Sequence, residues 1–109
     1  MAPEKPKQTT ETEQKVYDFV RALCGGESSI HRAILFGSRA RGDHQERSDF
    51  DLAIEAPGIS DEAWARFALE LRDKAPTLCG IDVVRLNSKT SKDLSSKIKN
   101  EGVKLYVRK

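Results

Sequence analysis

A Gly-Ser pair followed, after ten residues, by two aspartates one residue apart is the feature that most constrains this chain. Residues 37–51 read GSRARGDHQERSDFD, and the aspartates open an apolar run, SDFDLAIEA. Alternate side chains of a strand face the same side of a sheet. Asp49 and Asp51 are therefore predicted to project together, while Phe50 and Leu52 face the opposite side.

The segment before the aspartates, HRAILFGSRAR, predicts a strand that ends in a phosphate-binding turn. The strand is expected over residues 33–36, and Gly37 and Ser38 break it into a short helical turn. The first N–H groups of such a turn have no partner within it and favour a phosphate. Glycine lets the backbone approach a triphosphate closely, and the Ser38 hydroxyl can donate to a phosphate oxygen.

A third acid, Asp82, interrupts a second apolar run, GIDVVRLN. Asp82 is expected to lie in or near the sheet, where an unpaired buried carboxylate is costly unless an ion or hydrogen bonds satisfy it. Taken alone, an aspartate in a strand is more often an edge residue in water. Together with the Gly-Ser turn and the aspartate pair, it predicts a site for Mg²⁺, which prefers oxygen ligands and bridges carboxylates to phosphates.

Three arginines lie in the segment between the Gly-Ser pair and the aspartates: Arg39, Arg41 and Arg47. They could steer the phosphates of a nucleotide. In a chain this polar, a charged loop can equally be only solvated, so both interpretations stay open.

Composition limits the class of protein. The chain has 109 residues, 33% of them charged, and a net charge of +2, which is too small a bias to argue for nucleic-acid binding. Residues 1–9 are predicted to be a flexible tail and 10–109 a single domain. No apolar segment suggests a signal or a membrane span, so a cytoplasmic protein is expected.

Cys24 and Cys79 are too far apart for a zinc motif and are expected to be reduced.

Capping signals and apolar periodicity predict three helices. The first begins at Thr10, which forms a capping box with Glu13, and stops at Gly25 and Gly26. Ser60 can cap a second helix. The third is expected to start at Thr90 or Ser91 and to end at Gly102, before a last strand that includes Val103, Leu105 and Val107.

Residues 33–54 and 80–86 together resemble the minimal nucleotidyltransferases of the DNA polymerase beta-like nucleotidyltransferase superfamily. The family pattern is met at Gly37, Ser38, Asp49 and Asp51, and its third acid corresponds to Asp82. The resemblance implies an α/β (α+β) nucleotidyltransferase fold, with a small mixed sheet flanked by about three to four helices.

The resemblance also implies an activity. Such proteins transfer AMP from ATP to an acceptor hydroxyl, with Mg²⁺ held by Asp49, Asp51 and Asp82, and Asp82 would be either a metal ligand or the base. Gly37, Ser38, Arg39 and Arg41 would bind the nucleotide. Chains of this kind often act as antitoxins of HEPN ribonuclease toxins, which implies a tyrosine of such a toxin as the acceptor and a hetero-oligomer as the assembly.

Two other functions are compatible with the sequence. The chain could be a non-catalytic binding module that neutralises a HEPN partner by complex formation, or it could modify a small molecule in a cleft between two subunits. Catalysis needs all four residues of the Gly-Ser and aspartate pairs, whereas a binding module needs none of them. Their joint presence favours the enzyme.

Overall fold

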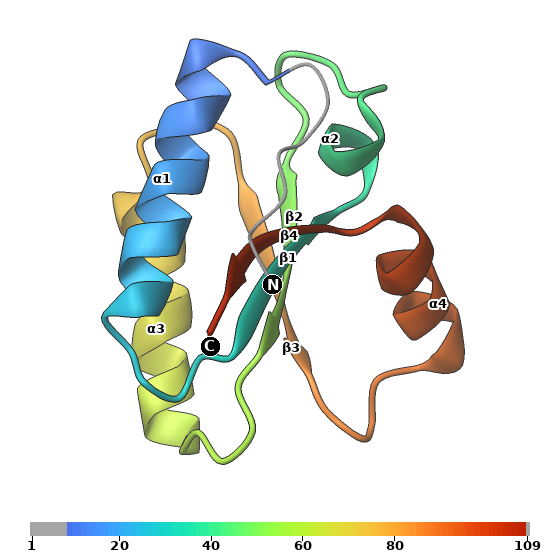
Figure 1. Ribbon diagram of the computed structural model, residues 1–109. Coiled ribbons are helices and arrows are strands. Elements are labelled where there is room, and N and C mark those ends of the chain that lie inside the picture. Colours follow the sequence, from blue (N-terminus) through green and yellow to red (C-terminus); the bar gives the residue numbers. More distant parts are fainter. Residues whose placement is uncertain (1–8, 109) are drawn as a thin grey trace.

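One four-stranded sheet with helices on both faces forms the protein, in a computed structural model that describes residues 9–108 (Figure 1). All but the last residue of the predicted N-terminal tail lies outside the described residues. The strands are β1 (Arg32–Phe36), β2 (Phe50–Glu55), β3 (Ile81–Leu86) and β4 (Val103–Val107). The helices are α1 (Glu11–Gly25), α2 (Ser38–Arg41), α3 (Asp61–Lys74) and α4 (Lys92–Glu101).

The sheet is mixed, with the strand order β3-β2-β1-β4. Strand β1 pairs antiparallel with both β2 and β4, whereas β2 and β3 are parallel. Parallel neighbours need a crossover connection, and α3 supplies it. The predicted fold class, a small mixed sheet flanked by three to four helices, is confirmed.

The predicted helix starts are confirmed by their capping hydrogen bonds. Thr10 and Glu13 form the full capping box of α1, since each side chain accepts from the other residue's backbone N–H. The hydroxyls of Ser60 and Ser91 accept from the backbone of Ala63 and Leu94 at the starts of α3 and α4. Such caps satisfy donors that have no partner within the helix.

The helices divide into two layers. Figure 1 shows α1 and α3 together on one side of the sheet and α4 on the other. The larger core lies under α1 and α3 and includes Val16, Val20, Phe50, Leu52 and Leu71. A smaller apolar cluster lies beneath α4 and contains Ile34, Phe36, Ala53 and Ile98. Within residues 9–108, no helix has the length and apolar character that a membrane span requires.

Candidate active site

The two aspartates of the DFD segment lie at the start of β2. The strand begins at Phe50, so Asp49 directly precedes it and Asp51 is its second residue. Phe50 and Leu52 are buried in the core with α1 and α3. Asp51 has the opposite parity and lies on the face of Ala53, which belongs to the cluster under α4. The predicted alternation along this strand is therefore confirmed.

Asp82 lies beside Asp51 in the parallel pairing of β2 and β3. Partners in such a pairing project from the same face, on strands about 4.8 Å apart. Strand β3 is an edge strand, and the Asp82 side chain is exposed. The prediction that Asp82 is a buried carboxylate in need of compensation is therefore wrong: it reaches solvent at the sheet edge, although it lies next to Asp51 as a shared site requires.

Burial and the neighbouring carboxylates affect the pKa of Asp51. Burial raises the pKa of its carboxyl above the ordinary value, and the negative charges of Asp82 and Asp49 raise it further. The positive charges of Lys97 and Arg41 act in the opposite direction. Three acids therefore share one electrostatic environment, and a cation placed among them would relieve the repulsion.

The Gly-Ser turn lies against this acidic cluster. Gly37 adopts φ 76° and ψ −157°, and a Cβ atom at this position would clash with the Asp51 carboxylate. Ser38 begins α2 directly afterwards. On the other side, the Gly80 N–H donates to Asp49 Oδ1 at 3.1 Å. Backbone without side chains therefore borders both aspartates, and each carboxylate occupies the space that a Cβ atom of the neighbouring glycine would need.

Two cations on helices act on the charge of Asp51. Arg41 of α2 donates to Asp43 Oδ2 and to Glu101 Oε1, both at 3.0 Å, and is exposed. Lys97 of α4 is exposed. Sequence reasoning did not single out Lys97 or Glu101 for the site. Their spacing of four residues, which places them on one side of a helix, was the available signal.

The expectation that Arg39 binds the nucleotide is wrong. The Arg39 side chain is only 4% exposed and is paired with Glu13. Its remaining N–H groups donate to the carbonyl oxygens of Ser48 and Glu46. Since these partners occupy the guanidinium, Arg39 is not available as a phosphate ligand. Arg47 is exposed, in agreement with the solvated alternative.

Asp49, Asp51 and Asp82 are suited to a divalent cation whose other ligands come from a bound substrate. Within the described part of the chain, no three carboxylate, imidazole or thiol groups lie close enough to enclose a metal ion by themselves. Mg²⁺ does not need such a cage, because it is usually bound by one or two carboxylates together with phosphates and waters. Burial and the charges of Asp82 and Asp49 raise the pKa of Asp51, and a bound cation would act against both effects.

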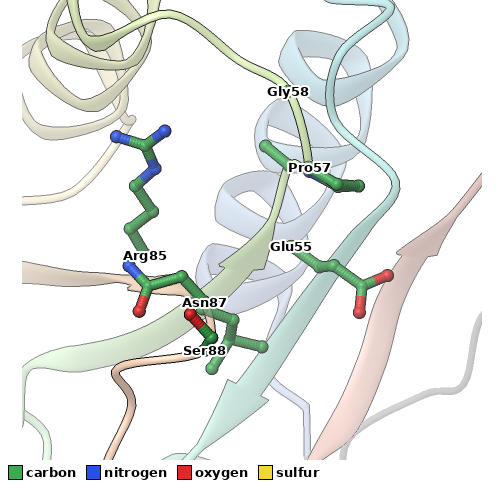
Figure 2. Close-up of a pocket in the computed structure, with 8 residues that line it drawn as sticks. Glu55, Pro57, Gly58, Arg85, Asn87 and Ser88 are labelled. Atoms are coloured by element: carbon green, nitrogen blue, oxygen red, sulfur yellow. The ribbon is translucent and has the colours of Figure 1, made fainter.

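A separate pocket lies at the opposite ends of the same two strands. Figure 2 shows its lining residues in the segments at the ends of β2 and β3. Its volume is about 440 Å³. Its lining includes Glu55, Pro57, Arg85 and Asn87. Arg85, the cation that could attract a ligand, already donates to Asp61 and to the carbonyl of Ile59. None of the three acids lines this pocket, which is therefore separate from the acidic site.

Comparison with known proteins gives one family and several similar folds. The family described as Polymerase beta, Nucleotidyltransferase matches residues 20–109. No curated protein sequence matches the chain.

The solved structures that resemble this chain include toxin–antitoxin complexes. A chain of one such complex, solved with AMP-PNP, has a TM-score of 0.68 and 23% identity over 85% of this chain and 74% of that chain. A chain from the tri-AMPylated Shewanella oneidensis HEPN toxin in complex with its MNT antitoxin has a TM-score of 0.62 and 20% identity, over 89% and 73%. A chain of the MntA–HepT complex has a TM-score of 0.64 and 22% identity, over 87% and 73%. At these identities the likeness is one of fold.

Proposed function

The chain belongs to the polymerase beta nucleotidyltransferase family, and from this premise we propose that it transfers AMP from ATP to a hydroxyl group of a protein partner. The observation that carries the proposal is the acidic cluster beside the Gly-Ser turn. Asp51 and Asp82 are neighbours in the sheet, and Gly37 leaves no room for a side chain against Asp51. Acids for a cation and a backbone turn for phosphates therefore meet at one place.

In this proposal the triphosphate lies between the Gly-Ser turn and the two helical cations. The backbone N–H groups of the turn and the Ser38 hydroxyl donate to phosphate oxygens. Arg41 and Lys97, which already act on the charge of Asp51, neutralise the phosphates. Arg41 exchanges its surface bonds to Asp43 and Glu101 for phosphate, a small loss because exposed ion pairs contribute little.

Asp49 and Asp51 would hold Mg²⁺, with Asp82 next to them. When bound, the cation neutralises charge on the phosphates and polarises the reacting oxygens. The Gly80 N–H holds the Asp49 carboxylate in place by its bond to Oδ1. Asp82 serves either as a further ligand or as the base for the acceptor hydroxyl, because both roles need a carboxylate at the same position.

The reaction is a displacement at the α-phosphorus of ATP. A bond forms from the acceptor oxygen to this phosphorus, and the bond to the bridging oxygen of the β-phosphate breaks. Pyrophosphate leaves, and a carboxylate such as Asp82 takes the proton of the hydroxyl. Phosphoryl transfer depends chiefly on alignment and charge stabilisation, so the chain's main contribution is to position these groups.

A HEPN toxin is the proposed partner, with a tyrosine as acceptor and the chain as its antitoxin. Support comes from the similar folds, which include chains of a complex solved with AMP-PNP and of a complex that contains a tri-AMPylated HEPN toxin.

Intact mass spectrometry of the partner tests the proposal. The product of the neighbouring gene, tested as the candidate HEPN partner, is incubated with this protein, ATP and Mg²⁺, and in parallel with an Asp49→Asn/Asp51→Asn variant. The expected result is the addition of one or more AMP groups with the wild-type protein alone. An unmodified toxin whose ribonuclease activity is still blocked in a stable complex would contradict catalysis and support the binding module instead.

A further inference from the structure

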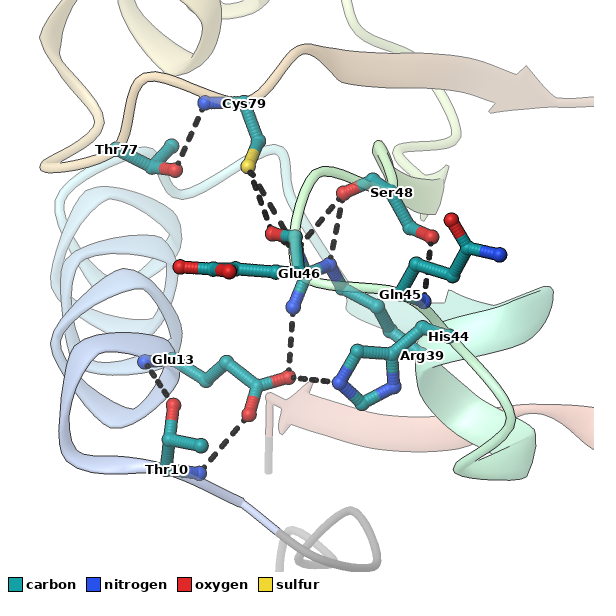
Figure 3. Close-up of polar contacts among 9 residues, drawn as sticks. All are labelled: Thr10, Glu13, Arg39, His44, Gln45, Glu46, Ser48, Thr77 and Cys79. Carbon is teal, nitrogen blue, oxygen red and sulfur yellow. Dashed lines mark hydrogen bonds and ion pairs between the residues drawn. The ribbon is translucent and has the colours of Figure 1, made fainter.

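A buried ion pair joins α1 to α2 beneath the loop that leads into β2 (Figure 3). Arg39 Nη1 donates to Glu13 Oε2 at 2.8 Å, and the two side chains are 4% and 6% exposed. Removing an ion pair from water is costly unless the remaining donors and acceptors are also bonded. Neither residue belongs to the acidic cluster, so the pair needs a separate explanation.

Glu13 is held in its charged form by several partners. Burial acts to raise its pKa, but hydrogen bonds from Thr10 and Arg39 and the charge of His44 outweigh that effect, so the pKa is lowered. The Thr10 N–H donates to Oε1 at 2.9 Å, and His44 Nε2 lies 3.0 Å from Oε2. Glu13 is therefore a fixed anion at the start of α1, and it anchors Arg39.

Arg39 uses its other donors on the backbone next to the catalytic acids. Its Nε and Nη2 both donate to the carbonyl oxygen of Ser48, at 3.0 and 2.8 Å, and Nη2 also donates to that of Glu46 at 3.1 Å. The guanidinium carbon lies 4.0 Å from the centre of the Phe50 ring. Ser48 and Phe50 are the two neighbours of Asp49 in the chain, so Arg39 holds the backbone on both sides of that acid.

The same guanidinium also reaches the segment that binds the Asp49 carboxylate. Arg39 Nη2 lies 3.6 Å from Cys79 Sγ, and this thiol lies 3.5 Å from the carbonyl oxygen of Glu46. The next residue, Gly80, donates to Asp49 Oδ1 and accepts from the Phe50 N–H. The backbone and the carboxylate of Asp49 are thus held by residues 46–48 and 79–80, and both segments contact Arg39.

We propose that Arg39, anchored by Glu13, is a positioning residue that sets the Asp49 and Asp51 carboxylates for a divalent cation and a nucleotide triphosphate. This inference rests on the proposed function. A planar guanidinium can bond to two carbonyls, a carboxylate and a ring face at once, which the single ammonium of lysine cannot do. The arrangement thus depends on the shape of arginine as well as on its charge.

An Arg39→Lys variant separates position from charge, with Arg108→Lys as the matched control. Arg108 also donates to three carbonyl oxygens, those of Ile30, Cys24 and Glu27. It follows β4 near Arg32, at the end of β1 away from the acids. Hydrogen exchange of the ligand-free proteins is measured first. Arg39→Lys is expected to speed exchange in residues 45–51 by about tenfold or more, whereas Arg108→Lys leaves that segment unchanged.

Binding of Mn²⁺ in the presence of a non-hydrolysable ATP analogue is measured next by electron paramagnetic resonance. Arg39→Lys is expected to weaken Mn²⁺ binding by about 10- to 100-fold, the usual effect of losing an outer partner of a metal ligand, in protein that circular dichroism shows to be folded. Glu13→Gln, which keeps the shape and loses the anion, provides a second variant with the same expected direction.

The outcomes are distinguishable. Exchange in residues 45–51 that stays unchanged in Arg39→Lys, or that rises equally in Arg108→Lys, overturns the positioning role. Unchanged Mn²⁺ affinity in both Arg39→Lys and Glu13→Gln overturns it as well. A wild-type protein that binds no Mn²⁺ with the ATP analogue overturns the proposed function, and the metal-directed part of the inference with it.

Discussion

Gly37 combines an unusual backbone conformation with close contact to the acidic cluster. Its φ of 76° lies in a region that other residues rarely adopt, and a Cβ atom there would clash with the Asp51 carboxylate. Gly58 provides a comparison, since it has a similar φ of 82° but nothing within 4 Å of the position of a Cβ atom. Alanine at Gly58 would therefore introduce backbone strain alone, whereas alanine at Gly37 would introduce both strain and the clash.

Gly37→Ala is expected to destabilise the protein by about 2–4 kcal/mol and to abolish nucleotide transfer, because it adds a clash with Asp51 to the backbone strain. Gly58→Ala is expected to cost only about 1–2 kcal/mol and to leave transfer unchanged. Urea unfolding and an AMP-transfer assay measure the two effects. Equal losses of activity in both variants would contradict a role for Gly37 in the site.

The ionised carboxylate of Asp51 destabilises the folded protein. Burial and the charges of Asp82 and Asp49 raise its pKa above 3.8 in the folded protein, so the folded state binds a proton more tightly than the unfolded chain does. Stability therefore falls as pH rises through this range, and at neutral pH the full repulsion remains. The carboxylate is only partly buried, so solvent screens part of the effect.

Asp51→Asn is accordingly expected to raise the melting temperature of the metal-free protein at pH 7 by about 2–4 °C, the shift that roughly 0.5 kcal/mol produces in a domain of this size. Added Mg²⁺ should stabilise the wild-type protein more than the variant. Differential scanning calorimetry with and without Mg²⁺ measures both. A lower melting temperature for the variant would show that Asp51 has a stabilising partner.

Helix α4 covers the face of the sheet that carries Asp51 and Asp82 through a narrow contact. Among its residues only Ile98 is buried, at 5% exposure, against Ile34, Phe36 and Ala53. Leu94, one turn earlier, is only partly buried. The position of Lys97, whose charge acts on Asp51, thus depends on how firmly the neighbouring Ile98 holds the helix.

Ile98→Ala is expected to cost about 2–4 kcal/mol of unfolding free energy, since it leaves a cavity under α4. It should also reduce nucleotide transfer, because Lys97 loses its fixed position. Leu94→Ala, the control on the same helix, should cost only about 1 kcal/mol because less apolar surface is lost. Urea unfolding compares the two variants. Equal costs would indicate that α4 is held by contacts other than Ile98.

At the scale of the whole molecule, the Glu13–Arg39 pair ties α1 to the turn and loop that carry the site. The folded pKa of Glu13 is lower than its ordinary value of 4.5. Its stabilising contribution is therefore fully present above pH 4.5 and is lost as pH falls through the folded pKa. This pH dependence is opposite in sign to that of Asp51.

Glu13→Gln is expected to lower stability at pH 7 by about 3 kcal/mol, because it leaves Arg39 as a buried charge without its counter-ion. Between pH 4.5 and 3 the difference from wild type should shrink, since the wild-type carboxylate also becomes protonated. Urea unfolding as a function of pH measures this convergence. A difference that stays constant down to pH 3 would show that the ionisation of Glu13 does not contribute.

Local sequence patterns were sufficient for the elements and for part of the site. The capping residues Thr10, Ser60 and Ser91 identified three helix starts, because a cap depends on residues only three apart. The alternation of Asp49 and Asp51 with buried residues followed from the two-residue period of a strand. The four-residue helix α2 at the Gly-Ser pair was likewise indicated by the turn.

What the sequence by itself determined is therefore the set of helices and strands and the common face of the two aspartates, since these depend on near neighbours. Only the tertiary structure decided that Asp82 is exposed, because exposure follows from the position of β3 at the sheet edge. It also decided that Arg39 is buried against Glu13, 26 residues away, and that the charge of Lys97 acts on Asp51. Burial and charge pairing depend on which distant segments pack together, and no local pattern specifies that.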